Sequence, residues 1–118
     1  MTAEFFFFVA LSFILTHELD AIKQREWRII PLTSFLNDRL GYLVFTVLHV
    51  PLFLILFWLL FSGDSLNLSL MRGLNIFFVI HLFLHLLLIK HPKNEFTNAL
   101  SWLLITGAGI SGGVSLLI

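Results

Sequence analysis

The sequence predicts an all-α integral membrane protein, a four-helix up-down bundle that forms one transmembrane domain over residues 1–118. Apolar residues make up 58% of the chain and charged residues only 12%, too few charges to cover a surface that faces water. Four apolar stretches each have roughly the 20 residues that a helix needs to cross a bilayer. Their continuous apolar character favours helices over barrel strands, which would alternate.

The same composition excludes several classes of protein. Seven Lys and Arg residues balance seven Asp and Glu residues, so the basic excess of a nucleic-acid binder is missing. The apolar excess excludes a soluble enzyme and a disordered tail. Because the chain has no Cys, it has no disulfide, no thiolate metal ligand and no Cys nucleophile.

The first span covers about residues 5–22. Its apolar part ends in His-Glu-Leu-Asp, residues 17–20, instead of a small-residue cleavage site, and no basic residue precedes it, so we expect a retained helix. The polar face of this helix is one arc of side chains, formed by Ser12, Thr16, His17, Asp20 and Gln24. Glu18 points nearly opposite, and we expect it to reach the interface or a partner chain.

A polar helix extension is expected over about residues 23–30, until Pro31 ends it. On this extension Glu26 lies beside Arg25 and Arg28. Charged neighbours of both signs are typical of a solvated helix face, and we interpret these three residues in that way.

The remaining spans cover about residues 40–61, 70–89 and 97–118. Short connections between them favour antiparallel neighbours. The outer half of the fourth span is rich in Gly, and Gly109 and Gly113 form a motif that allows close contact between helices. We expect this span to be the docking face for a homo-oligomer or a larger membrane complex.

The basic residues predict the orientation in the membrane. Only Arg72 lies on the side of the second connection. Because basic residues are enriched in cytoplasmic loops, we expect the first and third connections in the cytoplasm and both termini outside. The basic residues of those two connections are Lys23, Arg25, Arg28, Arg39, Lys90 and Lys93.

Four histidines on three spans lie at similar depths. With a rise of about 1.5 Å per residue, His17 and His85 lie roughly 7–9 Å inward from the nearest lysine of their loop. His49 is nine residues beyond Leu40 and His81 nine before Lys90, so both lie roughly 13 Å inward at the same rise. Ionisable groups at such depths usually face the interior of a bundle, so the pattern predicts a polar cavity near the cytoplasmic side.

This cavity is predicted to hold a transition metal, Zn or Fe, since imidazole nitrogens and a carboxylate are suitable ligands for both. The predicted ligands are His17, Asp20, His49, His81 and His85. Hydrogen bonds that orient these ligands are expected from Gln24, Tyr42, Thr46 and Asn98. Each imidazole could instead be a buried hydrogen-bonding group that joins two helices.

Haem is the alternative cofactor. His49 and His81 lie at matched depth on neighbouring spans, as two axial ligands of one iron would. The apolar side chains around them could line the porphyrin.

Residues 17–21, His-Glu-Leu-Asp-Ala, together with the later histidines, resemble small bacterial membrane proteins of the HXXEE type. Asp20 stands where that motif has its first glutamate, and Ala21 replaces the second. The resemblance covers five residues and the general layout. It implies a multi-helix membrane protein with a functional polar cluster.

Two classes of function remain open. The first is a metal-binding membrane protein, including a metal-dependent enzyme that acts on an amphiphilic or lipid-like substrate at the cytoplasmic leaflet, with Asp20 and His17 as the catalytic acid or base. The second is a non-catalytic small subunit of a membrane complex, whose histidines bind haem or a pigment or join helices.

Overall fold

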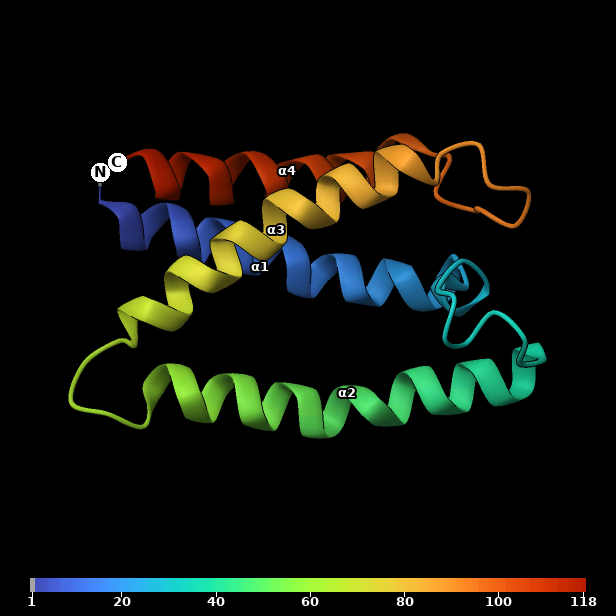
Figure 1. The fold of residues 1–118 in the computed structure, drawn as a ribbon, viewed down its shortest axis with the longest axis horizontal. Helices are drawn as coiled ribbons and strands as arrows, with labels where there is room; N and C mark the ends of the chain where they lie inside the picture. Colours follow the sequence, from blue (N-terminus) through green and yellow to red (C-terminus); the bar gives the residue numbers. More distant parts are fainter. Residues whose placement is uncertain (1) are drawn as a thin grey trace.

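A computed structural model describes residues 2–118 as four long helices, with no strand in this part of the chain. The helices α1 (Ala3–Lys23), α2 (Asp38–Phe61), α3 (Leu68–Leu87) and α4 (Ala99–Leu117) run alternately up and down (Figure 1). This confirms the predicted all-α four-helix fold, and the helices follow the predicted spans to within about two residues. All four are long and apolar enough to cross a membrane, so the chain is a multi-pass membrane protein.

Each helix begins at a polar residue that accepts a hydrogen bond from the backbone N–H three residues later. Thr2 caps α1 in this way, and the three other helices are capped by asparagine. Such a side chain satisfies one of the N–H groups that have no partner in the first turn. The caps of α2, α3 and α4 are Asn37, Asn67 and Asn98.

The first and last helices lie side by side, and α3 crosses them (Figure 1). Small residues permit this packing: a Cβ atom on Gly109 would lie 2.7 Å from Leu82 of α3, and one on Gly107 would lie 2.8 Å from the ring of Phe13 of α1. The Gly-rich part of α4 is therefore covered within the chain. These two glycines serve packing against α1 and α3, and the expectation that this span docks a homo-oligomer or a larger complex stays a prediction.

Helix α2 stands apart from the other three (Figure 1). It buries Gly41 and Phe45 near its start and Leu60 near its end, and the apolar side chains between are largely exposed. Exposed apolar residues are expected on a helix that faces lipid.

The first helix ends at Lys23 and does not continue to residue 30 as expected. Arg25 adopts the left-handed conformation, with φ of 53°, and a short 3-10 helix, η1 (Glu26–Arg28), follows. The reversal turns Trp27 inward, where its side chain is 2% exposed. Burial of this large aromatic ring outweighs the continued hydrogen bonding of a longer helix.

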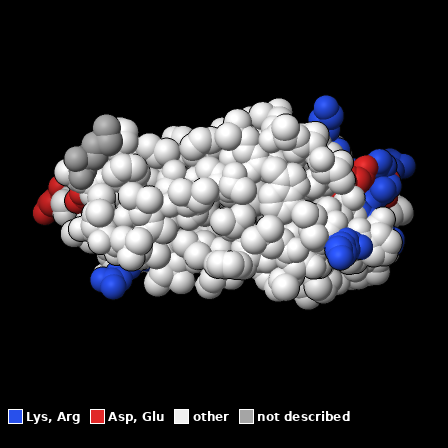
Figure 2. All heavy atoms as spheres, turned by 90° about the horizontal axis from the view of Figure 1, so that it is seen from above, with Lys and Arg blue, Asp and Glu red and all other residues white. Residues whose placement is uncertain are grey.

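Charged side chains gather at the two ends of the molecule, and Figure 2 shows most of the basic ones at a single end. The connections between α1 and α2 and between α3 and α4 lie at this end, opposite the two termini (Figure 1). The apolar surface between the ends matches a bilayer core. The assignment of the basic end to the cytoplasm remains a prediction.

Candidate metal centre

Three histidines from two helices meet near the basic end of the bundle. His17 of α1 lies 4.7 Å from His81 and 5.1 Å from His85 of α3, measured between ring centres, and the two α3 rings are 4.6 Å apart. His81 and His85 share one helix face because they are four residues apart. Their exposed fractions are 0% for His17, 8% for His81 and 4% for His85, so all three rings are buried.

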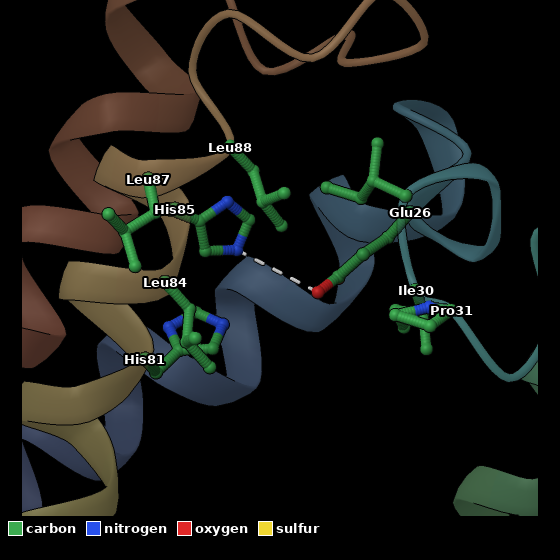
Figure 3. A pocket seen from close by; sticks show the side chains of 9 residues that line it. Glu26, Ile30, Pro31, His81, Leu84, His85, Leu87 and Leu88 are labelled. Carbon is green, nitrogen blue, oxygen red and sulfur yellow. Dashed lines mark ion pairs between the residues drawn. The ribbon is translucent and has the colours of Figure 1, made fainter.

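Glu26 of η1 completes this group. Its Oε2 atom lies 3.5 Å from Nε2 of His17, and its Oε1 atom lies 3.7 Å from Nε2 of His85. Figure 3 shows the carboxylate pointing from the η1 segment toward His85. One ligand atom from each of the four residues lies within 4.8 Å of the ligand atoms of the others. We call His17, Glu26, His81 and His85 the three-histidine cluster.

Several polar atoms of this cluster are buried without a hydrogen-bond partner. They are both ring nitrogens of His17, Nδ1 of His81 and Oε2 of Glu26. Buried polar groups almost always have partners, and unsatisfied ones are costly. Three imidazoles and one carboxylate that converge in this way form a donor set suited to Zn, Fe and similar ions.

The carboxyl group of Glu26 lies outside the membrane-spanning helices. Its burial acts to raise its pKa, but contacts with His17, His85 and His81 have a larger opposite effect, so the pKa lies below its usual value. An ionised carboxylate is the form that binds a cation.

Three contacts hold η1 in place. Trp27 packs against Gly41 so closely that any Cβ at that position would overlap the indole ring. Arg25 donates to Glu95 at 2.7 Å and 2.9 Å, while Arg28 donates to Asp38. These bonds join the η1 segment to α2 and to the α3–α4 connection, and the pKa of Arg25 is raised by its hydrogen bond to Glu95.

Two phenylalanine rings lie against the cluster: Phe96 is buried and Phe77 is 49% exposed. The ring of Phe96 lies 5.4 Å from His17 and 4.7 Å from His85, and the ring of Phe77 lies 5.8 Å from His81. Phe96 is 1% exposed, so it closes the side of the cluster that faces α4. An apolar cover of this kind keeps water from the ligand atoms.

Asp20, a predicted ligand, lies outside the cluster. Its Oδ2 accepts a 2.5 Å hydrogen bond from the Ser101 hydroxyl, and its Oδ1 accepts a 3.1 Å bond from the Gln24 amide. Asp20 thus joins α1 to α4. This corrects the expected five-residue group: the shared polar arc on α1 is wide enough for Asp20 and His17 to face different neighbours.

His49, the other predicted ligand, also lies outside the cluster. Its Nε2 lies 2.5 Å from Oε2 of Glu18, and its Nδ1 lies 2.5 Å from the backbone oxygen of Phe45. Both ring nitrogens are therefore occupied within the protein. Glu18 does point away from His17 as expected, but it meets α2 in the same chain.

The residues expected to orient the ligands are dispersed. Gln24 bonds to Asp20, and Asn98 caps α4. Tyr42 is largely exposed on α2, and the Thr46 hydroxyl is buried without a hydrogen-bond partner. None of these four belongs to the three-histidine cluster.

Glu26 is not among the ligands predicted from the sequence, which indicated a solvated helix face for it. A signal was present in the residues that follow it, since Trp27 and Ile29 are large apolar residues that a solvated extension would expose. Both are buried, at 2% and 4% exposure, and they bring Glu26 inward with them. Apolar residues at alternate positions in a polar segment therefore indicated a folded-back turn.

The fold and the cluster define a class: a multi-pass helical membrane protein with a buried group of three histidines and a carboxylate. The family described as "Family of unknown function (DUF6713)" matches residues 3–118, and the chain belongs to this family. The match gives no support to the HXXEE resemblance specifically. No curated protein and no solved structure matches the chain significantly.

Proposed function

We propose that this protein binds one transition metal ion at the three-histidine cluster. The observation that carries the proposal is the convergence of four ligand atoms within 4.8 Å, several of them buried without a hydrogen-bond partner. A bound cation would satisfy these atoms. Neutral imidazoles and a carboxylate suit Zn or Fe, and these remain the two candidate metals.

The competing proposal is a non-catalytic subunit whose histidines join helices or bind haem. Helix-joining histidines are expected to donate or accept hydrogen bonds, whereas neither ring nitrogen of His17 has a hydrogen-bond partner. Haem held between His49 and His81 would need a free nitrogen on each ring. Both nitrogens of His49 contact other groups, which favours the metal ion over haem.

A catalytic role requires an open coordination position. Four protein ligands complete a tetrahedral zinc site, while a six-coordinate ion such as Fe(II) keeps two positions free. An enzyme that acts on an amphiphilic substrate at the membrane surface would use those positions. The cavity beside His81 and His85 supports this extension of the proposal.

The test is the metal content of the purified protein in detergent, after dialysis against Zn(II) or, without oxygen, against Fe(II). We expect about one ion per wild-type chain and a large loss in His81→Ala and in His85→Ala. The matched control is His49→Ala, which removes a histidine of similar depth outside the cluster and should keep the ion.

Circular dichroism and size-exclusion chromatography on each variant show whether its helices and its monodispersity are retained. Absence of metal from a folded wild-type protein contradicts the proposal. Equal losses in the His49 and His85 variants contradict the assignment of ligands.

A further inference from the structure

A cavity of about 370 Å³ lies between the η1 segment and the last turns of α3 (Figure 3). Three residues of the three-histidine cluster, Glu26, His81 and His85, line it. The rest of its wall is apolar: Ile29, Ile30 and Pro31 on one side, and Leu84, Leu87 and Leu88 on the other. His17 is not part of this wall, so the cluster has a closed side at His17 and an accessible side at the cavity.

The size and lining fit the end of an apolar chain. Ligand pockets in proteins begin at about 300 Å³, and at roughly 30 Å³ per heavy atom this cavity holds about a dozen atoms. A small polar ligand would leave the leucine and isoleucine wall without a partner. A chain of methylene groups would cover that wall while its polar end reaches the cluster.

The position of the cavity opens it to the bilayer. Leu84 is 48% exposed and Leu87 is 78% exposed, and both belong to the membrane-spanning helix α3. Pro31 and Glu26 stand at the opposite wall, in the connection that follows α1. A molecule already in the leaflet can therefore enter sideways, without crossing water.

We infer that the cavity binds a single-chain amphiphile whose terminal oxygen group coordinates the metal ion, the class that includes fatty acids and fatty alcohols. This rests on the proposed metal site, with an ion that has an open position. His81, one of the residues that line the cavity, contributes a second observation, because its Nδ1 is buried without a hydrogen-bond partner. The apolar chain occupies the space between Ile30 and Leu84.

The test uses two probes with the same metal-binding group, acetohydroxamic acid and decanohydroxamic acid. Both are titrated into the Co(II)-loaded full chain in detergent, and binding is followed by the visible absorption of the cobalt. We expect the wild type to bind the decanoyl probe at least about tenfold more tightly, because each buried methylene adds to affinity.

Leu84→Trp fills the cavity without removing a metal ligand. Its matched control is Leu86→Trp on the same helix, since Leu84 and Leu86 are 48% and 45% exposed and Leu86 does not line the cavity. Leu84→Trp should weaken decanoyl binding about tenfold and leave acetyl binding within about twofold, while Leu86→Trp changes neither. The decanoyl probe partitions into detergent to the same extent with either variant. The ratio of the two variants' affinities is therefore independent of that partition. Ile30→Trp blocks the cavity from the opposite wall and should repeat the loss.

Metal content, measured on the same samples, separates the two proposals. Cobalt bound at one ion per chain, with no preference for the long probe or with no loss in either cavity-filled variant, overturns the amphiphile site and leaves the metal site standing. A folded wild type that binds no metal overturns both.

Discussion

Two groups of histidine and glutamate lie in this bundle, and they differ in how their polar atoms are satisfied. In the His49–Glu18 pair both ring nitrogens contact an oxygen atom, one from the carboxylate and one from the backbone of Phe45. In the three-histidine cluster neither ring nitrogen of His17 has a hydrogen-bond partner. The same side chains thus form a closed structural contact in one place and an open donor set in the other. The two groups have the same residue types at similar depths. They differ in whether their polar atoms have hydrogen-bond partners.

The largest effect should come from neutralising each glutamate in turn. Glu26→Gln removes the carboxylate of the cluster, and we expect the affinity for Zn(II) to fall at least about 100-fold. Glu18→Gln removes the carboxylate of the closed pair and should leave that affinity within about twofold. Competition with a chromophoric chelator measures both. Similar losses in the two variants would remove the distinction between the groups.

The second prediction concerns the support of the cluster. Gly41→Ala forces the indole ring of Trp27 to move, because any Cβ at that position overlaps it. We expect the free energy of unfolding to fall by about 1–3 kcal/mol and metal affinity to weaken with it. Gly73→Ala is the control, since a Cβ at Gly73 has no neighbour within 4 Å. Unfolding in mixed micelles with increasing SDS measures the stability of both variants. An unchanged stability of Gly41→Ala would contradict the packing described.

A smaller effect is expected from the bond between Asp20 and Ser101. Ser101→Ala removes the hydroxyl that donates to Asp20, and side-chain hydrogen bonds between membrane helices contribute on average about 1 kcal/mol or less. We expect that loss of stability with unchanged metal content. A drop in metal content would instead place Asp20 with the cluster, as the sequence had predicted.

The smallest effect is expected at the ion pairs on the basic end. Glu95→Gln breaks the contact with Arg25, whose side chain is partly exposed. Exposed pairs contribute about 0–1 kcal/mol and are screened by salt. The destabilisation should therefore be below about 1 kcal/mol at low ionic strength and vanish in concentrated salt, as SDS unfolding at two salt concentrations will show. A large, salt-independent loss would mean that this contact controls the position of Glu26.

Much of the fold follows from the sequence because length and apolar character determine membrane helices. The length of the apolar stretches locates the four spans. An Asn residue directly before α2, α3 and α4 marks where each of these helices begins. Similar depth groups His17, His49, His81 and His85, and the structure brings His17, His81 and His85 together. His81 and His85 meet through helical spacing, a purely local property.

The rest depends on contacts between distant segments. His49 has a suitable depth, but α2 stands apart and presents it to Glu18. Glu26 reaches the cluster because Arg25 takes a left-handed conformation, which an arginine rarely adopts. If α1 continued as a regular helix through residue 26, the side chain of Glu26 would point away from the cluster.

The side-by-side packing of α1 and α4 has a consequence for biosynthesis. The hydroxyl of Ser115, near the end of α4, donates a 2.7 Å hydrogen bond to the backbone oxygen of Ala3, at the start of α1. A ribosome delivers the first of these segments well before the last. Helix α1 therefore stays in the lipid without its main neighbour until α4 has been synthesised. Closure of the bundle then depends on a contact between two helices that leave the ribosome at well-separated times.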